Sequence, residues 1–239
     1  EAYTDNCNSC VGGNTDQSAC TQDCAGEWGG DAVVDEYWPD TDGDGLGFGS
    51  AVDYALDFDG ENDYVDMGEA TSMSIDDEIT ITSWIYHNSG SGHIVNQGGG
   101  WEDQGYSLWM YGSGIRIELQ NGNEKTYFDT PKPASNSWQH VSFTWDTNSN
   151  TTTVYYNGVL VNTNSNFNGP IGDPSQNLNI GRNQQHGQYF NGLINDITIW
   201  DRALSQSEVQ AVMNDGLCDN ESGLQAYYNF NQGSGITLH

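Results

Sequence analysis

The residues most clearly spaced for chemistry are the acidic ones between positions 40 and 46. Asp40, Asp42 and Asp44 alternate along the chain and are followed by Gly45 and Leu46. Three alternating carboxylates, a glycine for the sharp turn and a backbone carbonyl one residue later form a loop that can wrap Ca²⁺. The twelfth position of the loop, which normally supplies a bidentate acid, holds an alanine. A flexible acidic linker is therefore the alternative interpretation.

A second group of side chains combines aromatic rings with planar polar groups, as sugar-binding surfaces do. Aromatic faces stack on pyranose rings, while amide, acid or guanidinium groups pair with the hydroxyls. Trp109 and Tyr111 are two residues apart, so they share one face of a strand. We expect the tryptophan of a glycine-rich loop to be exposed to solvent. The predicted carbohydrate-binding residues are Trp101, Glu102, Gln104, Trp109, Tyr111 and Arg116.

The charge balance excludes several classes of partner. The chain has 34 acidic and 5 basic residues and a net charge of -29. Such a surface repels the phosphates of nucleic acids and of anionic membranes at contact distances. The sequence also contains no apolar stretch of about 18 residues, the minimum for a membrane-spanning helix. We therefore expect neither nucleic-acid binding nor membrane insertion.

The five cysteines indicate an extracellular protein. Cys7, Cys10, Cys20 and Cys24 cluster near the start, and Cys218 stands alone. The cluster is short and rich in glycine and asparagine, so it cannot bury a core and is expected to rely on disulfides rather than zinc. Four cysteines allow three pairings, and the spacing does not choose between them. Cys218 either joins this cluster or remains a thiol.

The pattern of apolar residues divides the chain near residue 50. Residues 1–50 show no evident strands and are predicted to form an irregular, cysteine-rich, calcium-binding arm. Residues 51–239 alternate between short apolar runs and turn residues, which predicts an all-β sandwich. The tryptophans at 84, 138, 145 and 200 are expected in its core. The predicted strands span residues 55–58, 64–67, 79–87, 93–97, 106–111, 115–119, 126–128, 139–145, 152–156, 159–162, 178–180, 193–200 and 224–230.

Two local signals add detail to the sandwich. Asn157 and Gly158 lie between two apolar runs, and both tolerate the positive φ of a type I′ turn, which predicts a β-hairpin. Ser205 and Glu208 precede an apolar periodicity and form a capping box, which predicts one short helix. The chain shows no alternation of strands and helices, so an α/β fold is excluded.

Seven segments together resemble the laminin-G-like domains of the concanavalin A-like lectin and glucanase family. The resemblance covers roughly residues 52–230, and the segments occur in the expected order. They are ALDFDGENDYV at 55–65, ITSWI at 81–85, WQHV at 138–141, VYYNGVLV at 154–161, NIGR at 179–182, FNGLINDITIW at 190–200 and RALS at 202–205. The resemblance implies a two-sheet antiparallel β-sandwich, a concanavalin A-like jelly roll.

The same resemblance implies a structural calcium ion near the rim of the sandwich. Carried over to this chain, Asp59 and Gly60 offer backbone oxygens, and Asp63 and Asp196 offer carboxylates. Calcium accepts such a mixture of carboxylate and carbonyl oxygens. The alternative is that Asp59 and Gly60 only mark a hairpin. The acidic loop of the arm, in turn, resembles thrombospondin type 3 or dockerin repeats more than a complete EF-hand.

Catalysis is not expected. Glycoside hydrolases with this fold use an E-x-D-x-x-E signature, and this chain offers Glu61, Asp63 and Asp66 at that spacing. The last acid is Asp rather than Glu, and the segment falls at the first turn rather than in the middle of a sheet. The leading hypothesis is a secreted, non-catalytic, calcium-binding module that binds a glycan or cell-surface ligand. The alternatives are a self-assembling subunit of an extracellular fibre or surface layer and, more distantly, a glycoside hydrolase.

Overall fold

The computed structural model describes residues 2–4, 10–12, 55–68, 75–98, 104–112, 114–122, 124–215, 217 and 221–230. The chain divides into two compact units. One contains residues 1–49 and 216–221, and the other contains residues 50–215 and 222–239.

The first unit contains a pair of short antiparallel strands, β1 (Ala2–Thr4) and β2 (Cys10–Gly12), in which Tyr3 lies opposite Val11. The sequence interpretation that residues 1–50 lack strands is therefore wrong at this point. Three-residue strands are too short to show the alternation of apolar and polar residues on which such an interpretation depends. The predicted calcium ligands Asp40, Asp42, Asp44 and Leu46 lie outside the described residues.

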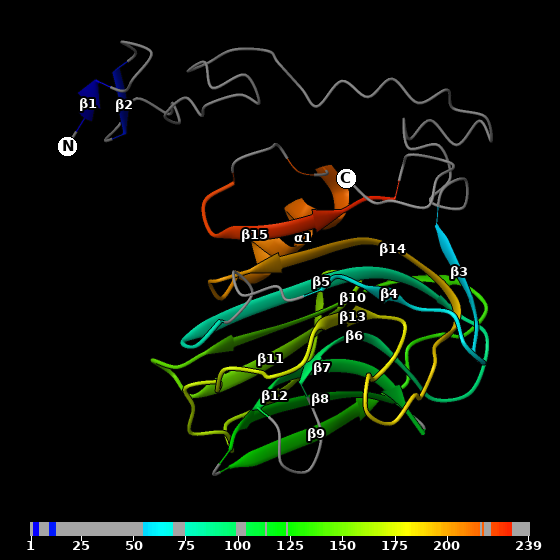
Figure 1. Cartoon of the computed structure of the whole chain (residues 1–239). Helices are drawn as coiled ribbons and strands as arrows, with labels where there is room; N and C mark the ends of the chain where they lie inside the picture. Colours follow the sequence, from blue (N-terminus) through cyan, green and yellow to red (C-terminus); the bar gives the residue numbers. More distant parts are fainter. Residues whose placement is uncertain are drawn as a thin grey trace, which may run out of the picture. The chain divides into compact units, whose positions relative to one another are not determined.

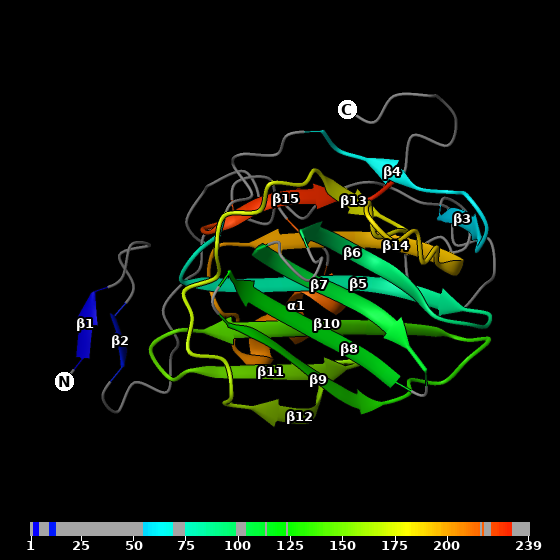
Figure 2. The same ribbon diagram turned by 60° about the horizontal axis from the view of Figure 1, so that its bottom comes forward.

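The second unit is a sandwich of two antiparallel sheets, as predicted (Figures 1 and 2). The seven-stranded sheet has the order β12-β11-β10-β5-β14-β15, and β3 also pairs with β14. Its strands are β12 (Val159–Asn164), β11 (Thr151–Tyr156), β10 (Trp138–Asp146), β5 (Glu78–His87), β14 (Asn191–Trp200), β15 (Leu224–Tyr228) and β3 (Leu56–Asp59).

The six-stranded sheet has the order β4-β13-β6-β7-β8-β9 and lies in front of the other sheet in Figure 2. Every strand predicted from residue 55 onward is present, with ends that differ by a few residues at most. The strands of this sheet are β4 (Val65–Asp66), β13 (Leu178–Ile180), β6 (Gly92–Gly98), β7 (Gln104–Tyr111), β8 (Gly114–Asn121) and β9 (Lys125–Pro131).

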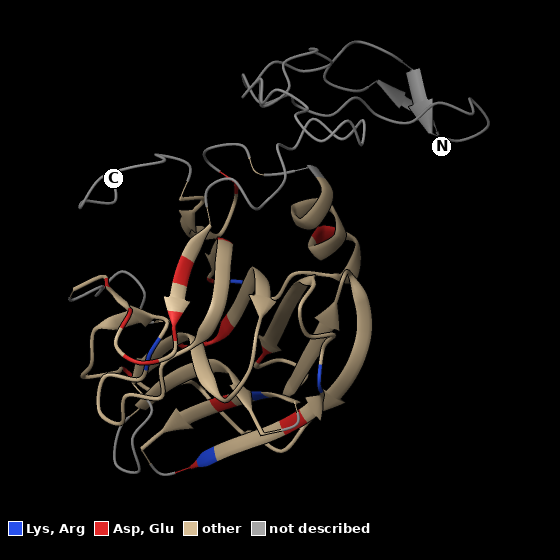
Figure 3. Ribbon diagram, turned by 90° about the vertical axis from the view of Figure 1, so that its right-hand side faces the viewer, with Lys and Arg blue, Asp and Glu red and all other residues tan. Residues whose placement is uncertain are grey.

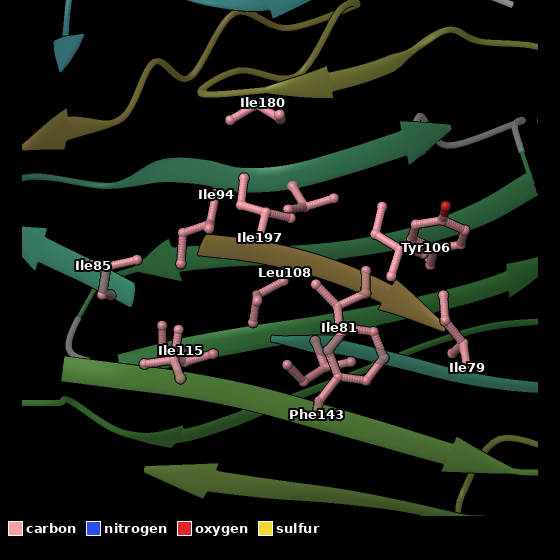
Figure 4. Packing of buried hydrophobic residues seen from close by; sticks show 14 of the residues in the cluster. Ile79, Ile81, Ile85, Ile94, Tyr106, Leu108, Ile115, Phe143, Ile180 and Ile197 are labelled. Carbon is pink, nitrogen blue, oxygen red and sulfur yellow. The ribbon is translucent and has the colours of Figure 1, made fainter. Parts of the chain in front are cut away.

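The core fills the space between the two sheets. Ile81 of β5 and Phe143 of β10 pair across the seven-stranded sheet, and Leu108 and Ile115 enter from the six-stranded sheet (Figure 4). All four side chains are fully buried. Burial of each large apolar side chain contributes about 1.5–3 kcal/mol. This apolar layer therefore fixes which face of every strand points inward.

The tryptophans follow the same alternation, and only part of their predicted placement is confirmed. Trp145 is a fully buried core residue. Trp84 and Trp138 are only half-buried, because the strand pleat directs them away from Ile85 and the other core residues of the seven-stranded sheet. Trp200 is buried but also lies outside the core cluster.

The predicted hairpin is confirmed. Asn157 and Gly158 connect β11 to β12, and both have the positive φ of a type I′ turn, 48° and 69°. The side chain of Asn157 also fixes the turn, because its Oδ1 accepts a hydrogen bond from the backbone N–H of His140 at 2.9 Å.

The predicted helix, α1 (Gln206–Asp215), is also confirmed, with its capping box. The backbone N–H of Ser205 donates to Glu208 Oε2 at 2.7 Å, and the N–H of Glu208 points back to Ser205 Oγ at 3.4 Å. Gln206 and Gln210 both donate to the carbonyl of Gly158, which attaches the helix to the hairpin. Among the residues that the structure describes, no helix has the length and apolar character needed to cross a bilayer.

Candidate functional site

A continuous row of side chains crosses the six-stranded sheet on the face that points away from the core. Asn96 of β6 lies opposite Ser107 of β7, and Ser107 lies opposite Glu118 of β8. Their chain neighbours, such as Leu108, enter the core, so the pleat turns these three outward. The row continues to both edges of the sheet. We call it the polar row, and its members from β4 to β9 are Asp66, Asn179, Asn96, Ser107, Glu118 and Tyr127.

Asn96, in the middle of the row, has a buried side chain that lacks hydrogen bonds. Its exposed fraction is 0%, and neither Oδ1 nor Nδ2 has a partner. The adjacent Asn179 is satisfied, since its Nδ2 donates to the carbonyl of Asn177 at 2.9 Å and its Oδ1 accepts from Arg182 Nε at 2.8 Å. An unpaired buried polar group costs about 1–3 kcal/mol. A hydroxyl group that both donates and accepts is the natural complement of the Asn96 amide.

Trp109 and His93 form a buried aromatic pair beside Asn96. Their rings stack at a centroid distance of 4.4 Å with an interplanar angle of 4°, and Trp109 Nε1 has no hydrogen-bond partner. Both nitrogens of His93 are engaged, Nδ1 with Ser107 Oγ at 2.8 Å and Nε2 with Gln188 Oε1 at 3.0 Å. Burial lowers the pKa of His93 to about 3, so the ring is neutral at physiological pH.

Arg116 forms an aromatic and charged platform toward the β9 edge. Its guanidinium lies 3.5 Å from the ring centroid of Tyr111 and 4.5 Å from that of Tyr127. Two hydrogen bonds to Asp129, of 2.6 and 2.8 Å, hold the group in place and raise the pKa of Arg116. Tyr111 and Tyr127 remain 41% and 53% exposed. We call Arg116, Tyr111 and Tyr127 the first platform.

Arg182 and Tyr64 form a second platform at the β4 edge. The guanidinium lies 3.3 Å from the ring centroid of Tyr64, which is 45% exposed. Arg182 is held by Asn179 and by an ion pair of 3.4 Å with Asp66. The polar row therefore has an exposed tyrosine backed by an arginine at each end.

Most of the chain's few basic residues gather on this face. Three of the five, Arg116, Lys125 and Arg182, form ion pairs with Asp129, Glu118 and Asp66 respectively. Figure 3 shows how sparse the basic residues are among the acidic ones. Glu118 is buried, and desolvation raises the pKa of its carboxyl. Within each of these three ion pairs the positive and negative charges cancel, although the chain as a whole has a net charge of -29.

Three predicted sugar-binding residues come together here. The centroids of Trp109 and Tyr111 are 4.7 Å apart on one strand face, as predicted, and Arg116 contacts both rings. Gln104 is not part of the group, because the pleat of β7 puts it on the side of the core residue Tyr106. Trp101 and Glu102 lie outside the described residues.

Sequence reasoning missed the members of the polar row and Arg182. The alternation within each strand could have marked Asn96, Ser107 and Glu118 as outward-facing. Their alignment into one row depends on the register of strands distant in sequence, which no local signal carries.

The predicted calcium ligands Asp59, Gly60 and Asp63 lie in the turn after β3. Asp59 Oδ1 accepts backbone hydrogen bonds from Glu61 at 2.7 Å and Asn62 at 3.2 Å, and these lower the pKa of Asp59. Asp63 Oδ2 accepts from the backbone N–H of Asp59 at 3.0 Å. The turn thus holds two carboxylates, which are oxygen ligands of the kind calcium prefers, while the Asp59 carbonyl accepts a hydrogen bond from Asn191 Nδ2 at 2.8 Å.

Asp196 is not brought to this turn. Asn191 of β14 lies opposite Asp59, and Asp196 lies five residues further along β14, roughly 16 Å away at about 3.3 Å per residue. It sits at a break in the strand register with φ 46°, where it accepts a hydrogen bond from the Tyr227 hydroxyl at 3.2 Å. The predicted four-residue calcium site is therefore not assembled. No group of three or more His, Cys, Asp or Glu side chains forms a metal cluster within the described part of the chain.

The three acids with hydrolase-like spacing also lie away from the middle of a sheet. Glu61 and Asp63 occupy the turn between β3 and β4, as expected from the sequence. Asp66, at the β4 edge, is occupied by Arg182 and by Asn177 Nδ2 at 2.8 Å. These acids therefore do not form a pair at the centre of the sheet.

Comparison with known proteins places this geometry in context. The family model of the concanavalin A-like lectin/glucanases superfamily matches residues 59–210, well over half of the chain. Human adhesion G-protein coupled receptor D1 is 32% identical over 111 residues, which is 44% of this chain. The match spans only 12% of that receptor.

Solved structures share the fold at low sequence identity. The CBM40 of the Ruminococcus gnavus IT-sialidase, bound to α2,3-sialyllactose, has a TM-score of 0.57 and 21% identity, covering 66% of this chain and 96% of the module. A heptameric SAP-like pentraxin from Limulus polyphemus has a TM-score of 0.56 and 20% identity, covering 77% and 91%. A putative carbohydrate-binding protein from Bacteroides ovatus has a TM-score of 0.57 and 20% identity, covering 73% and 50%.

The contrast between Asn96 and Asn179 predicts opposite effects of one substitution. Leucine has the same number of heavy atoms as asparagine and no polar groups. Asn96→Leu removes an amide without partners, so the free energy of unfolding should stay unchanged or rise by up to about 1 kcal/mol. Asn179→Leu leaves Arg182 Nε without its hydrogen-bond acceptor and should lower the free energy of unfolding by about 1–3 kcal/mol. Urea denaturation measures both, and equal losses would contradict the assignment of Asn96 as unpaired.

The buried Asp196 predicts a pH-dependent stability. Burial raises its pKa to about 6, above its value of about 3.9 in an unfolded chain. The folded state favours the protonated form of the Asp196 carboxyl. The stability that this preference contributes is fully present below pH 4 and is lost as the pH rises through 6. Asp196→Asn should flatten the dependence and stabilise the protein at pH 7 by about 1–2 kcal/mol, after a discount for partial solvent exposure. Thermal unfolding from pH 4 to 8 measures this, with exposed Asp57→Asn as control; parallel curves for wild type and Asp196→Asn would refute it.

Proposed function

Since the chain belongs to the concanavalin A-like lectin/glucanases superfamily, we propose that it is a carbohydrate-binding module whose ligand lies on the polar row. The observation that carries this proposal is the pair of platforms on the outer face of the six-stranded sheet, where tyrosine rings that are 41–53% exposed lie against anchored arginines. The Asn96 amide lies beneath this surface, since its exposed fraction is 0%.

The surrounding chemistry supports a sugar. The Asp129 carboxylate, whose side chain is 49% exposed, can accept hydrogen bonds from sugar hydroxyls beside the first platform. Exposed rings at Tyr111, Tyr127 and Tyr64 offer faces for the apolar side of a pyranose. The buried carboxylate of Glu118 adds an acceptor for hydroxyl pairs.

The similar proteins support the same class of ligand. The sialidase module is described as bound to a sialyllactose, and the Bacteroides protein as a putative carbohydrate-binding protein. We propose that this chain likewise acts in glycan binding or adhesion outside the cell. A non-catalytic role is part of the proposal and is supported by the acids of the Glu61–Asp66 segment, which lie at a turn and a sheet edge.

Substitution of an exposed tyrosine tests the proposal directly. On a glycan array, and by calorimetry with the strongest ligand, Tyr127→Ala should weaken binding by about tenfold, equivalent to the loss of about 1.4 kcal/mol of stacking. The fold should be retained, because Tyr127 is 53% exposed. Leu160→Ala is the control, because Leu160 is 51% exposed on β12 of the other sheet. An unchanged array profile for Tyr127→Ala would place the ligand elsewhere.

We also propose that the turn formed by Asp59, Gly60 and Asp63 binds calcium. The support is the presence of two carboxylates in the turn at the end of β3. Tyr64 follows this turn directly, so an ion there would also stiffen the second platform.

Calcium removal tests this second proposal. An ion that binds only the folded state at 1,000 times its Kd stabilises that state by about 4 kcal/mol. EDTA should therefore lower the Tm of the wild type by several degrees. Asp63→Asn should lower the Tm in calcium and reduce the response to EDTA. If Asp63→Asn responds to EDTA as the wild type does, the ion is not bound at this turn.

A further inference from the structure

We infer that Asn150 is an acceptor for N-linked glycosylation, that the glycan is added before the surrounding strands pair, and that it protects the edge strand β12. The acceptor sequence is asparagine, any residue except proline, and then serine or threonine. Asn150, Thr151 and Thr152 match it. The inference rests on the proposed location outside the cell, but it uses no residue of the polar row or of the platforms.

Asn150 lies at the surface, in the turn between β10 and β11. It is exposed, and its φ of 48° is in the left-handed region, which asparagine tolerates better than most residues. Other residues hold the turn, since Asp146 accepts hydrogen bonds from the backbone N–H of Asn148 at 2.8 Å and from Ser149 Oγ at 2.9 Å. Within the described part of the chain, no hydrogen bond engages the Asn150 amide. A sugar on Asn150 Nδ2 therefore breaks no contact of the turn.

The transfer to Asn150 requires an activated donor, an oligosaccharide linked to a lipid through a pyrophosphate. Asn150 Nδ2 attacks the anomeric carbon of the sugar and forms a carbon–nitrogen bond. The bond from that carbon to the pyrophosphate oxygen breaks, and the lipid pyrophosphate leaves with the electron pair. Nδ2 loses one proton, and no oxidant or reductant takes part.

The third residue of the acceptor sequence determines when this transfer takes place. Thr152 is only 2% exposed in the folded chain. It lies on β11 between Trp145 of β10 and Asn164 of β12, so its strand is paired on both sides. A transferase that recognises the Thr152 hydroxyl has no access to it once these strands have paired. The transfer therefore precedes the folding of this part of the sheet.

The acceptor lies beside an edge strand that lacks charged residues. β12 is the outermost strand of the seven-stranded sheet, and residues 147–172 contain no charged side chain. Val159 and Leu160 on this strand are 61% and 51% exposed. Edge strands pair with other chains unless charges, prolines or bulges prevent it. Here a register irregularity between Val154 and Tyr155 is the protection that the strands themselves provide.

A glycan on Asn150 adds protection at the other end of β12. Thr152 lies opposite Asn164, the last residue of β12, and Thr151 Oγ1 is 3.3 Å from Ser165 Oγ. Asn150 therefore precedes the residues against which β12 ends. A bulky, hydrated sugar at this position hinders a second chain from aligning along β12.

Secretion of the intact chain from cultured mammalian cells, directed by a signal peptide of the host, tests the site. All variants carry Asn220→Gln, because Asn220, outside the described residues, begins another matching sequence. Mass spectrometry after peptide N-glycosidase treatment in heavy-oxygen water should show Asn150 converted to labelled aspartate. Thr152→Ser should retain the glycan, while Thr152→Val and Asn150→Gln should lose it. An unmodified Asn150 in the secreted chain would overturn the inference, whereas the proposed sugar binding is tested separately by Tyr127→Ala.

Transfer in vitro tests the timing. A purified oligosaccharyltransferase and its lipid-linked donor are offered the folded chain made in bacteria, or a peptide of residues 146–156. The peptide should be modified at least about tenfold faster, because only the transiently opened fraction of the folded chain can react. Equal rates would overturn the claim that transfer precedes folding, and an unmodified peptide would overturn the site.

Analytical ultracentrifugation of the secreted chain tests the protection of β12. Asn150→Gln should self-associate at least about tenfold more tightly than the glycosylated chain. Adding Leu160→Lys to Asn150→Gln should restore the monomer, because a lysine on an edge strand opposes pairing. If the glycosylated chain and Asn150→Gln have the same mass at every concentration, the glycan does not protect this edge.

Discussion

The two-residue pleat of the antiparallel strands is the constraint on which the rest of this structure depends. In β7 it sends Leu108 and Met110 into the core and Ser107 and Trp109 to the outer face. A register slip of one residue would exchange the two sets and expose the apolar side chains. The free energy of core burial therefore fixes the register of the sheet. The same register aligns Asn96 with its neighbours, so the candidate site is positioned by the core beneath it.

Because the core fixes the register of the sheets, the sandwich tolerates buried polar groups that lower its free energy of unfolding. Asn96 and Trp109 Nε1 lack hydrogen-bond partners although both are buried. Next to them, His93, Ser107 and Asn179 are satisfied through hydrogen bonds within the protein. Unpaired buried atoms also occur in the seven-stranded sheet, in His140, Ser142 and Trp145 of β10, so they are not confined to the face of the polar row. Core burial therefore outweighs the cost of such groups in both sheets.

The fold could be predicted from the sequence because its signals are local. The positive φ demanded at Asn157 and Gly158, and the reciprocal bonds of Ser205 and Glu208, involve residues at most three positions apart. The site could be predicted only in part. Trp109 and Tyr111 share a strand, so their proximity follows from period two, whereas Asp66, Asn96 and Asn179 meet through the pairing of distant strands. The family resemblance groups Asp196 with the calcium turn, whereas the register of β14 with β3 places it further along the sheet.

The acidity of the chain and the chemistry of this face act at different ranges. Exposed charges are screened beyond a Debye length of about 8 Å at physiological ionic strength. The scattered acidic residues therefore influence the approach of a partner, while contact at the polar row is governed by groups within a few ångströms. There, Arg116, Lys125 and Arg182 meet carboxylates one to one. The chain has few basic residues, and most of them lie where buried or aligned carboxylates would otherwise repel one another. The ion pairs with Lys125 and Arg182 keep Glu118 and Asp66 ionised, so both carboxylates remain hydrogen-bond acceptors.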